Sequence, residues 1–173
     1  MVIDDGVTSR LSENNYIMTT TTGNAASVMS KLEDWLQTEW PELKVYLTSV
    51  TDHFATVSVC GPNSKKILEK VTQNIDYSDI NFPHMSFKNG LIDKINCRVM
   101  RISFTGELSY EINVQANYGQ SVWEKCIAAG KDYGITPYGT EAMHLLRAEK
   151  GFIIVGQETD GTVTPIDLQM DWI

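Results

Sequence analysis

The hydrophobic and polar positions near the start of the chain alternate in a way that predicts a β-hairpin. Residues 7–11 and 16–21 are short runs rich in Val, Leu, Tyr and Thr, and the polar residues 12–15 separate them. Residues 45–50 and 54–59 alternate in the same way, so we expect a second hairpin across the two polar residues that follow Val50.

Two further strands are expected in the second half of the chain. Residues 97–103 and 110–114 are rich in β-branched and apolar side chains, and Gly106 between them permits a tight bend. Hydrophobic positions in residues 76–89 recur at neither the strand nor the helix period, so this stretch is expected to be irregular.

Apolar residues at helical spacing predict four helices. After a predicted N-cap at Asn24, one apolar stripe continues until Pro41 stops it. The other predicted helices follow the turn at residues 61–64, cover residues 118–133, and cover residues 138–150 before Gly151.

This order of elements predicts an α+β domain in which antiparallel hairpins carry helices on one face, in a split β-α-β arrangement. With 173 residues and 42% hydrophobic content, one core is the default expectation. Neither end of the chain has a polar tail or cap, so we expect residues 1–173 to be a fragment of a larger domain.

The composition excludes several classes of function. Lys and Arg number 14 against 22 Asp and Glu, and the net charge of -8 argues against nucleic-acid and anionic-membrane partners. No apolar run is long enough to span a membrane and the first residues do not resemble a signal peptide, so a cytoplasmic location is expected. Three widely spaced cysteines indicate neither a metal site nor a disulfide framework.

The first candidate for chemistry is the acidic pair Asp4 and Asp5. Adjacent residues near a strand point to opposite faces, so at most one carboxylate enters a given pocket. There it can stabilise a developing cation or accept a proton from an amine. A solvated turn is the alternative reading.

The second candidate is Glu111, which lies inside an otherwise apolar strand. If it faces inward, the carboxylate needs donors, and the two parallel N–H groups at the edge of a pterin match it. Phe104 or Tyr110 would then pack on the ring. An outward-facing Glu on a half-exposed strand explains the pattern equally well.

The third candidate is a basic corner on the last predicted helix. His144, Arg147 and Lys150 recur at a spacing of three, so they share a face that can meet a carboxylate. Arg147 in an internal ion pair with a nearby glutamate is the alternative.

Three motifs together resemble one family. The pair Asp4–Asp5, the segment 105–112 and the helix end 146–151 match the acidic pair, the T-G-E-x-x-[FY]-E-[IV] strand and the L-R-x-E-x-G motif of the aminomethyltransferase family of the glycine cleavage system. Within that family, the chain is most similar to the folate-binding domain of heterotetrameric sarcosine oxidase large subunits. Four stretches carry this closer similarity: 4–10, 19–24, 134–141 and 161–165.

The resemblance implies that tetrahydrofolate is the bound cofactor and that the fold is the ferredoxin-like part of an aminomethyltransferase fold. It places Asp5 or Asp4 near the reactive nitrogens, with Asp5 preferred, and Glu111 at the pterin edge. The remaining implied contacts to the folate are Arg147, Phe104, Tyr110, Thr19 and Thr21.

The implied activity is the capture of the imine from sarcosine oxidation as 5,10-methylenetetrahydrofolate. Flavin and NAD sites are expected only in other parts of the complex, whose domains or subunits would be the partners of this chain. A glycine-cleavage-type aminomethyltransferase, a dimethylglycine dehydrogenase folate domain and a non-catalytic folate-binding module are the alternatives. In this interpretation the chain lacks the N-terminal part and the C-terminal barrel of the full domain.

Overall fold

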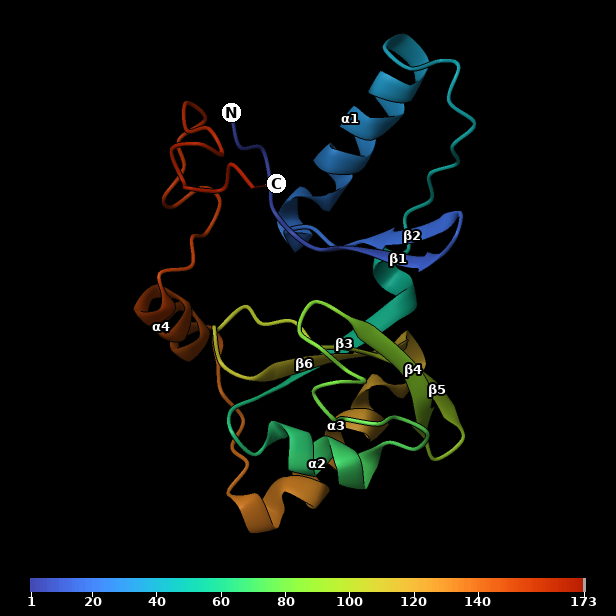
Figure 1. The fold of residues 1–173 in the computed structure, drawn as a ribbon, viewed down its shortest axis with the longest axis vertical. Coiled ribbons are helices and arrows are strands. Elements are labelled where there is room, and N and C mark those ends of the chain that lie inside the picture. The colour runs from blue at the N-terminus through green and yellow to red at the C-terminus, as the bar shows by residue number, and fades with distance from the viewer. Residues whose placement is uncertain (173) are drawn as a thin grey trace. The chain divides into compact units, whose positions relative to one another are not determined.

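The computed structural model describes residues 1–172, and these form two compact units. Unit 1 contains residues 1–51 and the residues from 153 onward, and unit 2 contains residues 52–152. Figure 1 shows the order of the helices and strands along the chain. Each unit is described by itself.

Unit 1 begins with the hairpin that the alternating pattern predicts. Strands β1 (Thr8–Ser12) and β2 (Asn15–Met18) pair antiparallel. The short 3-10 helix η1 (Thr22–Asn24) leads into α1 (Ala25–Thr38), and the residues after 152 form a loop. The predictions of the first hairpin and the first helix are confirmed.

Unit 1 has little buried apolar surface of its own. All the buried hydrophobic side chains among the described residues belong to unit 2. The apolar stripe of α1 is only half-buried, and none of the helix's residues is fully buried. Burial of apolar surface is the main favourable contribution to folding, so the described part of unit 1 is weakly stabilised by itself.

The predicted second hairpin is wrong. Residues 45–50 form no strand, and β3 (Phe54–Cys60) pairs antiparallel with β6 (Ser109–Gln115) along its whole length. This pairing buries Val57 and Val59 of β3 against the core, which a hairpin between neighbouring segments would not do.

The sheet of unit 2 has the strand order β3-β6-β5-β4, and every neighbouring pair is antiparallel. Strands β4 (Phe87–Ile92) and β5 (Ile95–Met100) form a hairpin. The expectation that residues 76–89 are irregular is wrong for residues 87–89, because β4 begins at Phe87.

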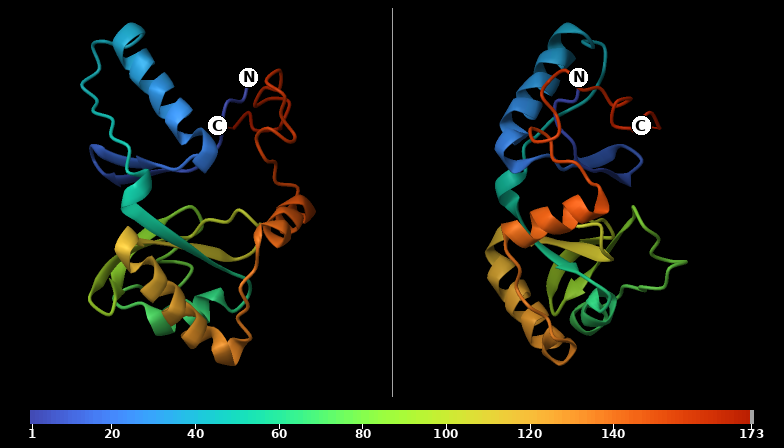
Figure 2. Two further views of the ribbon diagram at one scale, coloured as in Figure 1. Left: turned by 180° about the vertical axis from the view of Figure 1, so that it is seen from behind. Right: turned by 90° about the vertical axis from the view of Figure 1, so that its left-hand side faces the viewer.

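Helices α2 (Ser64–Val71) and α3 (Gly119–Gly130) contact each other and cover one face of this sheet (Figures 1 and 2). Helix α2 joins β3 and β4 at opposite edges, with β6 and β5 between them. The last helix of unit 2 is α4 (Thr140–Lys150), which ends at Gly151 in the left-handed conformation. The α+β class and the predicted helices are confirmed.

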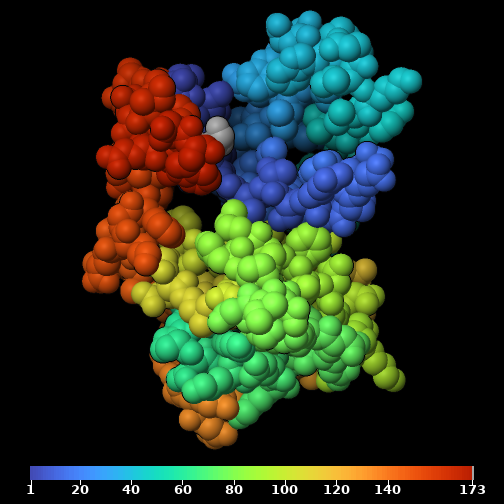
Figure 3. Space-filling view, in the orientation of Figure 1, coloured from blue at the N-terminus to red at the C-terminus, as the bar shows by residue number. Residues whose placement is uncertain are grey.

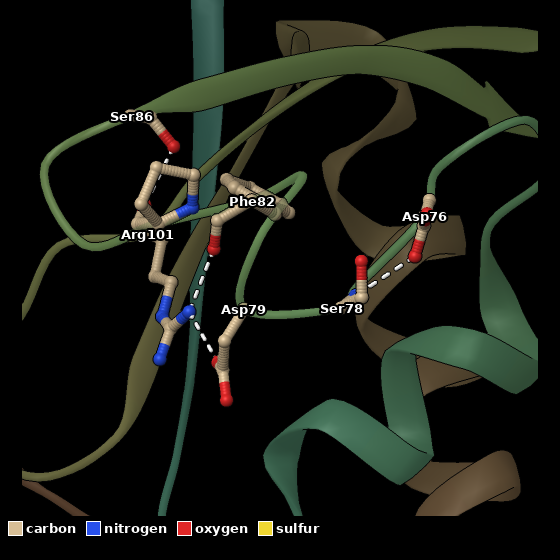
Figure 4. A network of polar contacts seen from close by, with 7 residues as sticks. Asp76, Ser78, Asp79, Phe82, Ser86 and Arg101 are labelled. Carbon is tan, nitrogen blue, oxygen red and sulfur yellow. Dashed lines mark hydrogen bonds and ion pairs between the residues drawn. The ribbon is translucent and has the colours of Figure 1, made fainter.

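The core of unit 2 includes a cluster of three aromatic side chains. Tyr77, Phe82 and Tyr110 pack with ring centroids 5.4 to 5.6 Å apart. Figure 4 shows the polar contacts that hold the loop carrying the first two rings. Arg101 donates hydrogen bonds to the Asp79 carboxylate at 2.7 Å and to the Phe82 carbonyl at 2.6 Å. Arg101, just after β5, therefore ties this loop down at two points.

Candidate functional site

The sheet of unit 2 has one apolar face and one polar face. Successive residues of a strand point to opposite faces, so Tyr110 and Glu111 separate. Tyr110 is 1% exposed and lies in the core beneath the helices, whereas Glu111 projects from the opposite face. Tyr110 therefore shapes the packing of β6, and Glu111 is the residue of the pair that a ligand on the polar face can meet.

Glu111 lies in a row of side chains across the polar face. Its strand register places it beside Ser58 of β3 and Met100 of β5. Burial raises the pKa of the Glu111 carboxyl above its usual value. Among the residues that the structure describes, none donates a hydrogen bond to this carboxylate, so its acceptor capacity is unused by the protein.

Three side chains near Glu111 were not singled out by the sequence. Ser58 accompanies Cys60 on the same face of β3, and its hydroxyl lies 3.4 Å from that of Ser109 on β6. The Tyr138 hydroxyl lies near Ser58 and Cys60, and its pKa is raised by burial and further by Cys60 and the Glu111 charge. No local signal reveals this group, because strand pairing between distant segments creates it.

Arg147 is buried on α4, at 7% exposure. Its Nη1 donates a hydrogen bond of 3.0 Å to the carbonyl of Phe152, just beyond the helix end. The reversal of the chain at Gly151, with φ of 82°, brings that carbonyl back toward the guanidinium. The helix terminus thus fixes the direction of the Arg147 side chain.

Phe104 lies in the connection between β5 and β6 and is 40% exposed. Its neighbour Thr105 is buried, and Gly106 turns the chain with φ of +80° where a side chain would meet Lys150. The tight bend predicted at Gly106 is confirmed. Among the aromatic candidates, Phe104 is the one whose ring is available to a ligand.

Asp4 organises the junction between the hairpin and α1 in unit 1. Its carboxylate accepts hydrogen bonds from the Thr21 hydroxyl at 2.7 Å, the Asp5 amide at 2.8 Å and the Asn24 side chain at 3.0 Å. Partial burial raises the pKa of Asp4, but these hydrogen bonds outweigh that effect and the net pKa is lowered. Asn24 binds Asp4 instead of capping its own helix.

Asp5 has the opposite electrostatic environment. Asp5 is exposed as a residue, but partial desolvation of its carboxyl is the largest cause that raises its pKa, and the negative charge of Asp4 raises it further. No side chain among the described residues donates a hydrogen bond to the Asp5 carboxylate. Asp4 is therefore an occupied structural acceptor, while Asp5 keeps a carboxylate that can act on a bound molecule.

Thr19 joins the two ends of the segment around the acidic pair. Its backbone amide and hydroxyl both bond to Val7, and its carbonyl oxygen lies where a side chain at Gly6 would project. Thr21 is held by Asp4. Unit 1 thus brings together Asp4, Asp5, Thr19 and Thr21, and unit 2 carries Glu111, Arg147, Phe104 and Tyr110.

Neither a metal site nor a membrane-spanning helix is found among residues 1–172. No group of three or more His, Cys, Asp or Glu side chains in this part of the chain is arranged to hold a metal ion. None of its helices has the length and apolar character needed to cross a bilayer.

Comparison with protein families identifies the fold. The family model of the GCVT N-terminal domain matches residues 1–173. The chain belongs to this family. The resemblance inferred from the acidic pair, the strand motif and the helix end is therefore confirmed.

Several relatives are enzymes or enzyme subunits. The chain is 57% identical over its full length to sarcosine oxidase subunit alpha of Corynebacterium sp. (strain P-1), and it covers 18% of that protein. It is 45% identical over 96% of its length to the same subunit of Rhizobium meliloti (strain 1021), covering 17% of it. An aminomethyltransferase of Caldanaerobacter subterraneus is 35% identical over 96% of this chain and is covered to 43%.

The fold also matches a solved structure. The glycine cleavage system aminomethyltransferase T from Bartonella henselae aligns with a TM-score of 0.82 at 21% identity, over 99% of this chain and 43% of that one. This chain thus spans less than half the length of each of these relatives. Its α+β architecture is shared with the aminomethyltransferase.

Proposed function

We propose that this GCVT N-terminal domain binds tetrahydrofolate and takes part in one-carbon transfer within a sarcosine oxidase alpha subunit. The single observation that carries the proposal is Glu111, a half-buried carboxylate with a raised pKa and no donor among the described residues. The similarity to sarcosine oxidase alpha subunits, which exceeds that to aminomethyltransferases, supports the choice of parent enzyme.

The side chains of the proposed site match the chemistry of the cofactor. A pterin presents two parallel N–H donors, and a carboxylate accepts such a pair as a fork. Burial makes an ionised Glu111 costly until donors reach it, so the binding of a neutral ligand edge would relieve that cost. Phe104 supplies an exposed ring for stacking, and Arg147 supplies a fixed positive charge.

In this proposal Asp5 is the residue that acts on the reacting nitrogen, and Asp4 positions it. Tetrahydrofolate supplies the nucleophilic amine that captures a one-carbon unit. The Asp5 carboxylate offsets positive charge near that amine and accepts its proton, which its raised pKa favours. Asp4, held by Thr21 and Asn24, keeps the strand in place and adds a negative charge beside Asp5.

The parent reaction that this function serves is the oxidation of a secondary methylamine such as sarcosine. The CH2 carbon of the imine formed there would bond to the two folate nitrogens to give 5,10-methylenetetrahydrofolate, while its bond to the substrate nitrogen breaks and that nitrogen takes up the released protons and leaves as the primary amine. The flavin and NAD sites would belong to other domains or subunits. A glycine-cleavage-type aminomethyltransferase is the second candidate, supported by the 35% identity to the aminomethyltransferase of Caldanaerobacter subterraneus. Formation of methylenetetrahydrofolate from sarcosine, but not from an aminomethylated carrier protein, separates the two.

Calorimetric titration of the protein with tetrahydrofolate tests the binding step. Glu111→Ala should weaken binding by roughly 2 to 4 kcal/mol, because a buried charge-assisted fork is lost. Glu107→Ala is the matched control, since Glu107 is exposed in the neighbouring loop and should leave affinity unchanged. Equal affinities for wild type and Glu111→Ala would remove Glu111 from the site, and no binding by the wild type at high micromolar ligand would contradict the proposal for this chain.

A further inference from the structure

Arg98 of β5 lies on the same face of the unit 2 sheet as Glu111. Its strand register places it opposite Asn113 of β6, and Met100, two residues further along β5, lies opposite Glu111. Because side chains two residues apart on a strand share a face, Arg98 is a diagonal neighbour of Glu111, with Cα atoms about 7 to 8 Å apart. The polar face of the sheet therefore carries a basic and an acidic group close together.

Two aromatic rings lie close to the Arg98 guanidinium. Its Cζ is 5.9 Å from the ring centroid of Phe54 on β3 and 5.8 Å from that of Phe87 on β4. Both distances are within the range of cation–π contacts. Phe54 is 37% exposed, so one wall of this cage contacts solvent. The two rings restrict the guanidinium, which lowers the entropy that a ligand must remove to bind it.

The hydrogen-bonding capacity of Arg98 is unused by the protein. Its Nε and Nη1 atoms are buried, and neither has an acceptor among the described residues. Arg98 forms no ion pair with Glu111 or with any other described carboxylate. Burial lowers the pKa of Arg98 below its usual value, because desolvation disfavours the charged form. A bound anion would relieve this cost.

The neighbours of Arg98 on the polar face do not supply that anion. Asn113, directly opposite, turns toward β3, where its Nδ2 donates a hydrogen bond of 3.0 Å to Thr56 Oγ1. Among the strand residues that the structure describes on this face, Arg98 is the one basic side chain and Glu111 the one acidic side chain. The face thus presents one unused donor group and one unused acceptor group.

We propose that Arg98 binds a carboxylate of the ligand that Glu111 holds by its donor edge. This inference rests on the proposed folate function and extends it to a second recognition point. A carboxylate accepts charge-assisted hydrogen bonds from a guanidinium and carries a single charge, which one arginine offsets. A doubly charged phosphate would leave negative charge beside Glu111, which disfavours it.

Two ligand groups have this chemistry. One is the glutamyl tail of tetrahydrofolate, and the other is the carboxylate of an imine derived from an amino acid such as sarcosine. Both are carboxylates, so both satisfy the same guanidinium. The two sources are distinguished by ligands that contain one and lack the other.

Calorimetric titration with two pterins tests the folate tail. Tetrahydrofolate has the tail, and 6-methyltetrahydropterin has the same pterin edge without it. Arg98→Met removes the charge but keeps an unbranched side chain beside the rings. If Arg98 binds the tail, this variant should bind tetrahydrofolate at least about tenfold more weakly and bind 6-methyltetrahydropterin as the wild type does.

Lys94→Met is the matched control for this titration. It removes the same charge from the exposed turn between β4 and β5, which Figure 3 shows on the molecular surface in yellow-green. Its affinity for both pterins should equal that of the wild type. Circular dichroism of both variants verifies that each is folded.

Nuclear magnetic resonance of the wild-type protein tests the amino-acid carboxylate. Glycine carries the carboxylate of the amine that leaves when the sarcosine-derived imine reacts, and methylamine lacks it. With 6-methyltetrahydropterin bound, glycine should shift the Arg98 Nε–H signal and methylamine should not. A shift with tetrahydrofolate but not with 6-methyltetrahydropterin would assign the tail instead. Because this measurement uses the wild type, it decides the question even where Arg98→Met does not fold.

Two results would overturn the inference. One is an Arg98 Nε–H signal that responds to neither tetrahydrofolate nor glycine. The other is an equal loss of affinity for both pterins in Arg98→Met, which would make Arg98 a structural residue only. Tetrahydrofolate binding that depends on Glu111 but not on Arg98, with no glycine response, would keep the proposed function and reject the carboxylate site. If the wild type binds neither pterin, the proposed function fails, and the response of the Arg98 signal to glycine alone decides the carboxylate site.

Discussion

Glu111 and Asp5 both have a raised pKa, and for related reasons. Burial is the largest cause at each carboxyl, and the charge of Asp4 adds to it at Asp5. A carboxylate that is costly to ionise in the free protein interacts strongly with donors or positive charge on a ligand. These two residues are thus the ones at which pH should report ligand binding.

Binding of tetrahydrofolate should depend on the ionisation of Glu111. The fork requires the carboxylate, so affinity should fall as pH falls through a pKa that lies above the ordinary value of 4.5. Glu111→Gln cannot ionise and should bind weakly with little pH dependence in that window. Calorimetry at a series of pH values on both proteins measures the difference, and parallel pH profiles would count against an ionised Glu111 in the fork.

Asp4 should contribute to stability at neutral pH. Asp4→Ala removes the acceptor for Thr21 and Asn24, and we expect a loss of about 1 kcal/mol in the free energy of unfolding because the carboxylate is mostly solvated. The folded pKa of Asp4 is lowered, so its contribution is present above the unfolded pKa and is lost as pH falls through the folded value.

Urea unfolding at pH 7 and about pH 3 checks this sign. The difference between wild type and Asp4→Ala should shrink at the lower pH. Glu13→Ala, in the exposed turn of the same hairpin, serves as the control and should change little at either pH. A difference that grows on acidification would show that Asp4 is not stabilised as its carboxylate.

At the scale of the elements, the start of the first hairpin depends on a close approach of two backbone segments. Gly6 has φ of 154°, and a side chain there would collide with the carbonyl oxygen of Thr19. Gly6→Ala should therefore destabilise the hairpin by about 2 kcal/mol. Gly23→Ala is the control, because its added methyl meets no atom within 4 Å. Thermal unfolding by circular dichroism compares the two, and equal melting temperatures would exclude the collision.

The loop before β4 depends on its buried rings. Phe82 is 0% exposed and contacts Tyr77 and Tyr110, so Phe82→Ala should cost about 3 to 5 kcal/mol. Ile80 in the same loop is 91% exposed, and Ile80→Ala should be near neutral. Denaturant unfolding measures both, and a small effect of Phe82→Ala would show that the loop is not part of the unit 2 core.

At the scale of the whole molecule, the two units differ in how much apolar surface they bury. Unit 2 contains the whole buried hydrophobic core of the described residues, whereas unit 1 relies on the hairpin, α1 and polar contacts. Amide hydrogen exchange in dilute protein should therefore be slowest in β3, β5 and β6. Residues 44–50 make no backbone–backbone hydrogen bond among the described residues and should exchange fast, so protection equal to that of β6 would contradict this arrangement.

Elements that depend on a few neighbouring residues were predictable from the amino-acid pattern. The helices, the first hairpin and the bends formed where local patterns predicted them. These patterns are the apolar stripe in residues 24–41, the turn residues 12–15 and the glycines at 106 and 151. The family could also be predicted from the sequence, because the acidic pair and each of the two motifs is a short continuous stretch of residues.

Strand partners, and the surroundings of the side chains on each face of the sheet, became known from the folded chain. The alternating pattern predicted that residues 45–50 and 54–59 pair with each other. In the structure β3 instead pairs with β6, a strand far along the chain, and its Val57 and Val59 are buried in the core. That distant pairing also places Ser58 beside Glu111 and turns Tyr110 into the core. Strand pairing depends on the apolar surface that the whole sheet buries, which involves segments distant in sequence. A local pattern of hydrophobic and polar residues therefore does not predict it.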